Sequence, residues 1–309
     1  MAKIIKITQA TPATYLTWVI NNICTNACSY CHPSLHTGTN HNYDWSHAEE
    51  FIDRVLLRYP KIHVAISGGE PTLSPWFKDL VKKFSDAGHP VGVTSNGART
   101  VDYYRDISKY LSYIVMSYHP SYEDENFIAK ALACAENTHC TVSLMMDSRY
   151  LDKCLNMYIK LSDYKQLSVE PVRIHDWGAK TTFGRDYSLE QSNLIAGLAK
   201  IFAKKPTRPA IEGYTGATAF YEDGVELRLN AQKLINENNT NFIGWECNIG
   251  LESLYVKYDG MIRSGNCITS PVIGKIQDSD NILWPMQPII CKQTFCNCTT
   301  DVYVSKKKL

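Results

Sequence analysis

Three thiols lie within eight residues in the stretch Cys24-Thr25-Asn26-Ala27-Cys28-Ser29-Tyr30-Cys31. Thiolates are soft ligands, and three of them on one short loop are enough to hold three irons of a cubic [4Fe-4S] cluster. The next cysteine along the chain is Cys134, so no fourth thiol at similar spacing completes the set. One iron would stay open to an outside ligand, and an open position distinguishes a reaction site from a closed structural one. The alternatives for this triplet are a zinc knuckle or scattered structural thiols.

The composition of the 309 residues, 44% hydrophobic and 20% charged, is that of an ordinary globular protein. A net charge of +1 provides no long-range field for nucleic acid or an anionic membrane, so we expect neither partner. The tail Lys306-Lys307-Lys308 is interpreted as a solvated chain end. No secretory segment is visible, and eleven cysteines without one indicate metal or redox chemistry in a reducing compartment, which predicts a cytoplasmic protein.

Apolar patterns typical of strands and helices alternate along the first two thirds of the chain. The predicted strands are 15–20, 62–67, 91–95, 113–117, 141–147 and 167–173, and the predicted helices are 45–58, 76–87, 101–110, 123–137, 151–161 and 189–203. A repeated strand–helix order implies parallel strands joined by right-handed crossovers. Six units are too few for a closed eight-stranded barrel, so we predict an open, partial (β/α)6 barrel. Its chemistry should lie at the carboxyl ends of the strands.

The last third of the chain has a different character. Residues 176–187 are predicted to form a loop and residues 225–234 a helix. Two short strands on either side of Asp259-Gly260 predict a hairpin. We therefore divide the chain into a barrel domain of residues 1–204, a connection of residues 205–245, and a small Cys-rich α+β domain of residues 246–309.

The cysteine triplet, with an aromatic residue before its last cysteine, resembles the signature of the radical S-adenosylmethionine (SAM) superfamily. Gly68-Gly69-Glu70-Pro71, directly after the second predicted strand, resembles the family motif that contacts the amino group of SAM. Glycines let the backbone approach a ligand closely, and exposed carbonyls together with Glu70 can accept from an ammonium group. The resemblance implies a TIM-like barrel whose open iron binds the amino and carboxylate groups of SAM. One electron then breaks a C–S bond, giving methionine and a 5′-deoxyadenosyl radical that abstracts hydrogen from a substrate.

Polar residues at other strand ends resemble further SAM-binding positions of this family. Ser95 and Asn96 resemble residues that bond the ribose or the carboxylate of SAM, and Ser117 resembles another such position. Tyr30 stands where the family places an aromatic residue near the adenine. Each of these residues is equally compatible with an ordinary cap or turn.

His119 is the candidate catalytic residue on the substrate side, as a proton shuttle or by positioning the substrate. The alternative is a loop histidine whose hydrogen bonds are satisfied within the protein. Asp147 and Glu170 are further candidates of the same kind. Arg149 and Arg173 could pair with an anion, but are interpreted as solvated or ion-paired arginines.

A second group of thiols resembles the auxiliary-cluster module, SPASM or its shorter form twitch, of many radical SAM enzymes. Its members are Cys247, Cys267, Cys291, Cys296 and Cys298. They are too few for two clusters, but four of them could hold one [4Fe-4S] cluster. The Cys-x-Cys ending at Cys298 departs from the Cys-x2-Cys ending of a twitch module, so which of the last three is spare stays open, and a spare thiol such as Cys298 could donate hydrogen to a substrate radical. The rival interpretation is a structural zinc site. The remaining Cys134, Cys140 and Cys154 are interpreted as small buried hydrophobic residues.

These features together predict a radical SAM enzyme that oxidises, epimerises or rearranges its substrate. The substrate classes implied by the resemblance are a small molecule, a nucleoside or sugar, or a peptide. We favour a small molecule because no separate peptide-recognition domain is evident. The resemblance also implies a reductase, flavodoxin or ferredoxin as electron donor. Two other classes stay open: a two-cluster electron-transfer protein and a zinc-stabilised binding protein.

Overall fold

The structure, a computed structural model, describes residues 3–10, 13–122, 124–174, 186–202, 216–267, 269–296 and 298–309. The chain divides into two compact units. Unit 1 comprises residues 1–19, 42–65 and 210–309, and unit 2 comprises residues 20–41 and 66–209. The predicted loop at 176–187 and the predicted helix start at Glu123 lie wholly or partly outside the described residues.

The predicted alternation of strands and helices is confirmed. Its elements follow in the order β2 (Thr14–Val19), α1 (Trp45–Arg58), β3 (Ile62–Ser67), α2 (Phe77–Asp86), β4 (Val91–Ser95), α3 (Val101–Ile107), β5 (Tyr113–Tyr118), α4 (Phe127–Ala135), β6 (His139–Met145), α5 (Leu151–Ser162), β7 (Leu167–Val172) and α6 (Leu189–Phe202). Local chemistry sets the helix starts: the Asp44 carboxylate accepts from the backbone N–H of His47 at the start of α1. The fold class is the predicted one, a mixed α/β fold with the parallel sheet of a partial barrel and an added antiparallel sheet.

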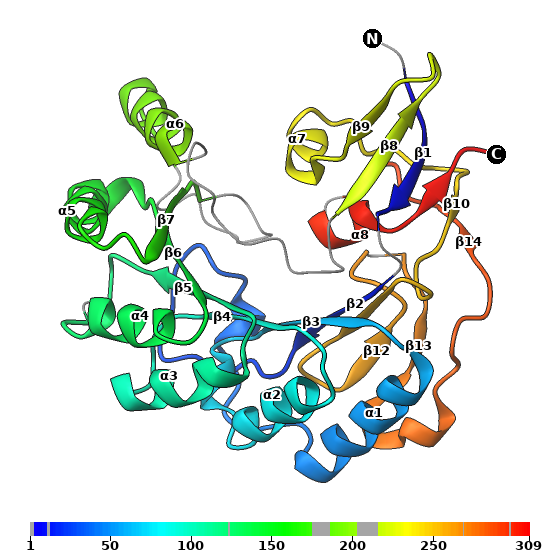
Figure 1. Cartoon of the computed structure of the whole chain (residues 1–309), viewed down its shortest axis with the longest axis horizontal. Helices are drawn as coiled ribbons and strands as arrows, with labels where there is room; N and C mark the ends of the chain where they lie inside the picture. The colour runs from blue at the N-terminus through cyan, green and yellow to red at the C-terminus, as the bar shows by residue number, and fades with distance from the viewer. Residues whose placement is uncertain are drawn as a thin grey trace. The chain divides into compact units, whose positions relative to one another are not determined.

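Unit 2 contains four parallel strands paired in the order β4-β5-β6-β7. On one face of these strands aliphatic side chains such as Ile114 and Val142 are fully buried, and α3 and α4 lie side by side along the sheet (Figure 1). Parallel pairing brings the carboxyl ends of the strands to one edge. The segments that follow β4, β5 and β6 therefore lie next to one another.

Unit 1 holds the added antiparallel sheet, ordered β14-β10-β15-β1-β8-β9 (Figure 1). Its strands are β1 (Ile4–Gln9), β8 (Ala217–Tyr221), β9 (Glu226–Arg228), β10 (Glu246–Cys247), β14 (Ile289–Ile290) and β15 (Lys306–Lys307). A cluster that includes Ile7, Phe242, Trp245 and Val302 forms its core. The prediction of a helix over 225–234 is wrong for its first half, where the chain forms β9. Helix α7 (Ala231–Asn236) begins after Asn230, whose side chain accepts from the backbone N–H of Lys233.

The hairpin predicted around Asp259-Gly260 is confirmed. It joins β11 (Ser253–Val256) to β12 (Met261–Arg263), and β13 (Val272–Lys275) extends it. Strand β11 also pairs in parallel with β2, so unit 1 has the order β13-β12-β11-β2-β3. The C-terminal residues therefore belong to the same compact unit as the first strands. The predicted division into domains of residues 1–204, 205–245 and 246–309 stays a prediction.

The basic tail is not simply a solvated end. Lys306 lies in β15 and is only 4% exposed, whereas Lys307 and Lys308 are exposed. The interpretation of three solvated lysines is therefore wrong for Lys306. Strand β15 directly follows α8 (Thr299–Tyr303), and pairing with β1 and β10 carries Lys306 inward.

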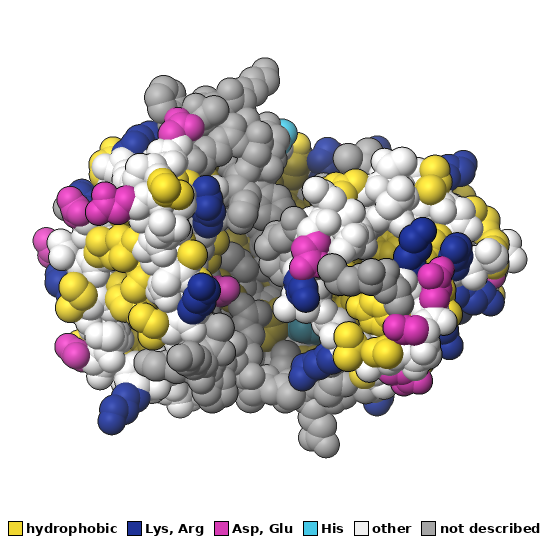
Figure 2. Space-filling view, turned by 90° about the horizontal axis from the view of Figure 1, so that it is seen from above, with side chains coloured by type: hydrophobic (Ala, Val, Ile, Leu, Met, Phe, Trp, Pro, Cys, Tyr) yellow, Lys and Arg dark blue, Asp and Glu magenta, His cyan; other side chains and the backbone are white. Residues whose placement is uncertain are grey.

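Acidic and basic side chains lie intermixed on the described surface visible in Figure 2, in keeping with the net charge of +1. Within the described ranges, the helices are all too short or too polar to cross a bilayer.

Replacing Gly260 by Ala should lower the free energy of unfolding by about 1–3 kcal/mol. Gly260 has a φ of +85°, and a Cβ there would lie 2.3 Å from Oε1 of Gln277. The matched control is Gly197→Ala in the exposed part of α6, where a Cβ meets no atom within 4 Å; it should raise stability by about 0.5–1 kcal/mol. Chemical denaturation of both variants measures the difference, and equal effects would contradict the assigned turn.

Candidate active site

The three cysteines of the 24–31 loop lie in unit 2, and the loop turns where the N–H of Cys31 donates to the carbonyl of Cys28 at 3.0 Å. Two nitrogen groups donate to the Cys24 sulfur at 3.4 Å: the backbone N–H of Asn26 and the side-chain amide of Asn96. Nδ1 of His119 lies 3.4 Å from the Cys28 sulfur. Hydrogen bonds to sulfur are typical of the thiolates that hold iron–sulfur clusters.

The donor set fits a cluster better than a single ion. In the described part of the chain, no three His, Cys, Asp or Glu side chains lie close enough together to hold one metal ion. Thiolates on a cubic cluster each bind a different iron, so they lie farther apart than ligands that share one ion. Cys24, Cys28 and Cys31 lie along one turning loop, and polar groups lie at the sulfurs of Cys24 and Cys28. Three such thiolates can each bind a different iron of one cluster.

Residues from neighbouring strand ends brace this loop. The hydroxyl of Tyr122 accepts from the N–H of Ala27 at 2.7 Å. Arg149 donates to the hydroxyl of Ser29 at 3.0 Å and pairs with the fully buried carboxylate of Asp147. Arg149 is thus ion-paired, as expected. The bracing roles of Tyr122 and Ser29 were missed, because nothing local in the sequence marks a long-range hydrogen bond.

The Gly-Gly-Glu-Pro turn packs against the same loop. The N–H groups of Gly69 and Glu70 donate to the carbonyls of Asn21 and Ile23 at 2.9 and 2.7 Å. A Cβ on Gly69 would lie 2.4 Å from the carbonyl oxygens of Ile23 and Leu35. The close approach of this turn to protein backbone therefore requires the glycine, and its predicted approach to a ligand stays a prediction.

The Glu70 carboxylate is fully buried and receives four hydrogen bonds from the protein. Its Oε1 accepts from the N–H of Thr72 (3.0 Å), the hydroxyl of Thr72 (2.6 Å) and the hydroxyl of Ser95 (2.8 Å). Its Oε2 accepts from the N–H of Asn96 at 2.6 Å. Burial raises the pKa of this carboxyl, and the donors oppose the shift. These donors come from both segments, so Glu70 joins the turn to the end of β4. Its contact with SAM stays a prediction.

A cavity of about 210 Å³ lies beside the cysteine loop in unit 2. Of the predicted residues it brings together Asn96, Ser117 and His119; Tyr30, Gly68, Gly69, Glu70, Pro71 and Ser95 are not among its lining. Oδ1 of Asn96 is buried and has no hydrogen-bond partner within the described residues. A buried acceptor without a partner is costly, and it fits a ligand that brings an O–H or N–H group.

His119 and Tyr30 form a pair at the edge of this cavity. Nδ1 of His119 lies 2.7 Å from the Tyr30 hydroxyl, and the two rings stack with centroids 6.0 Å apart. Burial lowers the pKa of His119 to about 4, so the imidazole is neutral near pH 7. Burial also raises the pKa of Tyr30, and so do the nearby thiols. The geometry has His119 orienting Tyr30, and proton transfer by His119 stays a prediction.

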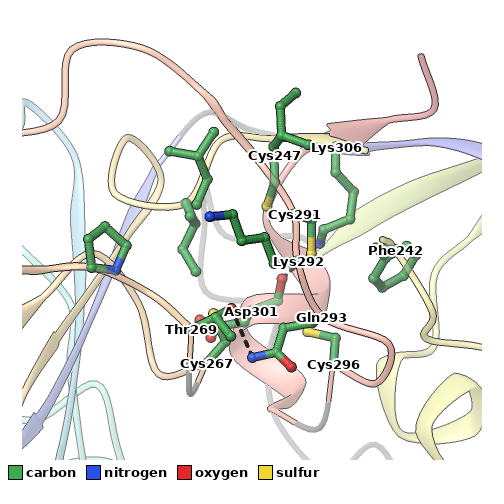
Figure 3. A pocket seen from close by; sticks show the side chains of 14 residues that line it. Phe242, Cys247, Cys267, Thr269, Cys291, Lys292, Gln293, Cys296, Asp301 and Lys306 are labelled. Atoms are coloured by element: carbon green, nitrogen blue, oxygen red, sulfur yellow. Dashed lines mark hydrogen bonds between the residues drawn. The ribbon is translucent and has the colours of Figure 1, made fainter. Parts of the chain in front are cut away.

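Four of the five C-terminal thiols line one cavity of about 330 Å³ in unit 1 (Figure 3). These are Cys247, Cys267, Cys291 and Cys296. Cys298 is not among the lining residues; its sulfur accepts from the side-chain amide of Asn266 at 3.2 Å. Burial raises the pKa of Cys247 to about 11 and that of Cys296 to about 12, and in both cases the charge of Lys306 opposes the shift.

All eleven cysteines are free thiols. Cys134, Cys140 and Cys154 are completely buried, which confirms their interpretation as small hydrophobic residues.

In a comparison with known protein families, residues 18–142 match the model of the Radical SAM superfamily. No curated protein matches the chain. Among solved structures, the chain is similar to Streptococcus suis SuiB bound to S-adenosylmethionine, with 14% identity and a TM-score of 0.56 over 85% of this chain and 63% of SuiB. A second crystal structure of Streptococcus suis SuiB is 14% identical, with a TM-score of 0.54; the match covers 84% of this chain and 61% of SuiB. Native anSMEcpe with bound AdoMet and the Kp18Cys peptide is 16% identical, with a TM-score of 0.51; the match covers 86% of this chain and 78% of anSMEcpe. At these identities the likeness establishes the fold, and the chain spans less than two thirds of SuiB.

Replacing Glu70 by Gln should lower the free energy of unfolding of the metal-free protein by roughly 2–3 kcal/mol, because an amide N–H₂ would face backbone and hydroxyl donors. Glu125→Gln, at an exposed position, is the matched control and should have little effect. Thermal or denaturant unfolding of both variants measures the difference. If Glu70→Gln were as stable as the control, the carboxylate would not hold the turn to β4.

Proposed function

We propose, since residues 18–142 match the radical SAM superfamily, that the protein uses a [4Fe-4S] cluster on Cys24, Cys28 and Cys31 to cleave SAM reductively. When bound, the cluster supplies the electron that splits SAM into methionine and a 5′-deoxyadenosyl radical, which takes a hydrogen atom from a substrate C–H. One observation carries the proposal. Asn96, which donates to the Cys24 sulfur, and His119, whose Nδ1 lies 3.4 Å from the Cys28 sulfur, also line the adjoining cavity.

The chain's own residues prepare this cavity for a cofactor. Among the described residues, no cysteine lines it, so the fourth iron would have no thiolate of its own. The unpartnered Oδ1 of Asn96 would accept a hydrogen bond from SAM, and Ser117 adds a hydroxyl beside it. The Tyr30 hydroxyl is held by His119 and also bonds with the Cys28 thiol. Glu70 would act indirectly, by fixing the backbone of Asn96.

We assign a second [4Fe-4S] cluster to Cys247, Cys267, Cys291 and Cys296, because these four thiols line one cavity. Cys298 is then the spare thiol of the terminal group, held away by Asn266. Donation of hydrogen to a substrate radical by Cys298 remains part of the proposal.

The net reaction and its substrate belong to the proposal as well. Oxidation, epimerisation and rearrangement each follow from removal of one hydrogen atom. The sequence favours a small molecule, nucleoside or sugar as the substrate. The anSMEcpe structure contains a bound peptide, which supports a peptide as a further substrate class. We propose a reductase, flavodoxin or ferredoxin as electron donor, and a cytoplasmic setting that keeps the eleven thiols reduced.

Anaerobic reconstitution with iron and sulfide, followed by SAM and dithionite, should yield 5′-deoxyadenosine detectable by mass spectrometry. The variant with Cys24, Cys28 and Cys31 all replaced by Ala should yield none and should hold about half the iron, since only the second cluster remains. Colourless protein that holds zinc would support the zinc-stabilised class. Iron–sulfur protein that shows no interaction with SAM would support the electron carrier.

Replacing Cys296 by Ser should abolish the second cluster, whereas Cys298→Ser should leave its iron and sulfide content unchanged. The two cysteines are separated by one residue, so they form a matched pair that differs in access to the cavity. Iron and sulfide analysis in the Cys24, Cys28 and Cys31 to Ala background measures the second cluster alone. The reverse result would exchange the roles of the two thiols.

A further inference from the structure

Lys306 is an unusual neighbour for a group of thiols because it is almost completely buried. Its backbone pairs directly opposite Cys247 in the antiparallel sheet. Its side chain lines the same 330 Å³ cavity as the four cysteines, and Figure 3 shows both Lys306 and Cys247 among the lining residues. Nothing in the predicted cluster-binding motif requires a lysine at this position.

Three carbonyl oxygens hold the Lys306 side chain. Its Nζ donates to the carbonyls of Asp301 (2.8 Å), Val302 (3.0 Å) and Val304 (2.7 Å), and lies 4.9 Å from the centre of the Phe242 ring. Only the ammonium form has three N–H donors. The carbonyls at the end of α8 carry the negative end of the helix dipole and favour a cation. The fold therefore maintains a fixed positive charge at the wall of the cavity.

This charge acts on the thiols. Lys306 lines the same cavity as Cys247 and Cys296 and pairs with Cys247 across the sheet, so its ammonium group lies beside these thiols. Asp301 is buried in the lining of the same cavity, and its carboxylate is the opposing charge.

We propose that the buried ammonium group of Lys306 raises the reduction potential of the auxiliary cluster. This rests on the proposed function, in which the four cavity thiols hold a [4Fe-4S] cluster. Uptake of one electron adds one negative charge to the cluster, and a buried ammonium with little water to screen it stabilises the reduced form more than the oxidised form.

A raised potential favours one of the possible outcomes. A substrate carbon radical that loses one electron to the cluster and one proton to solvent becomes an alkene or a carbonyl group. The cluster is the oxidant in that step and is reduced by one electron. Lys306 thus favours net oxidation over return of a hydrogen atom to the substrate.

The test uses the full chain with Cys24, Cys28 and Cys31 replaced by Ala, so that only the auxiliary cluster is present. In an EPR-monitored redox titration, Lys306→Met should lower the ratio of reduced to oxidised cluster at a fixed potential by about tenfold, which corresponds to about 59 mV for one electron. Lys307→Met is the matched control on the exposed neighbouring residue and should not shift the midpoint. Lys306→Arg, which keeps the charge, should restore most of the potential.

Asp301→Asn is an independent test, and it should raise the midpoint reduction potential, whereas Lys306→Met should lower it. A midpoint that is the same in the parent, in Lys306→Met and in Asp301→Asn would overturn the proposal and leave Lys306 a structural cap of α8. If Lys306→Met fails to fold, Lys306→Gln with Asp301→Asn gives the same comparison. Failure of the parent protein to hold any cluster is a different result, since it contradicts the proposed function itself.

Discussion

The buried carboxylate of Glu70 is the constraint on which the arrangement of unit 2 depends. It collects donors from Thr72, Ser95 and the backbone of Asn96, and an unpaired carboxylate in that position would be too costly to retain. Asn96 in turn directs its side-chain amide to the Cys24 sulfur. A single buried group thus sets the distance between the turn after β3, the end of β4 and the cysteine loop. The glycines complete this arrangement by letting the turn approach the carbonyls of Ile23 and Leu35.

The two groups of thiols share a design although they lie in different units. Each is placed by short segments that strands or turns hold in position, and each has polar groups directed at its sulfurs. They differ in charge. The 24–31 loop is supported by neutral side chains, Asn96 and His119, whereas the cavity in unit 1 has the buried ammonium of Lys306 and the carboxylate of Asp301. That difference suits the roles we propose for them: binding and cleavage of a cofactor in unit 2, and exchange of electrons in unit 1.

The sequence predicted the barrel elements well because their signals are local: apolar periodicity, the Asp44 cap, and the Asp259-Gly260 turn are read within a few residues. It predicted the cysteine groups because thiol spacing is visible in the chain. It missed β1 and the parallel pairing of β11 with β2, since both depend on partners far away in sequence. For the same reason it took Lys306 for a solvated residue and did not predict the hydrogen bonds by which Glu70 joins the turn to β4. Burial and long-range hydrogen bonds decide both roles, and neither leaves a local pattern.

The most direct test of the account is the EPR spectrum of the dithionite-reduced, reconstituted protein before and after addition of SAM. We expect the signals of two clusters, of which one changes when SAM is added and is lost when Cys24, Cys28 and Cys31 are replaced by Ala. Spectra that SAM leaves unchanged, or a SAM-sensitive signal that survives those replacements, would contradict the assignment of the cysteine loop as the site of SAM cleavage.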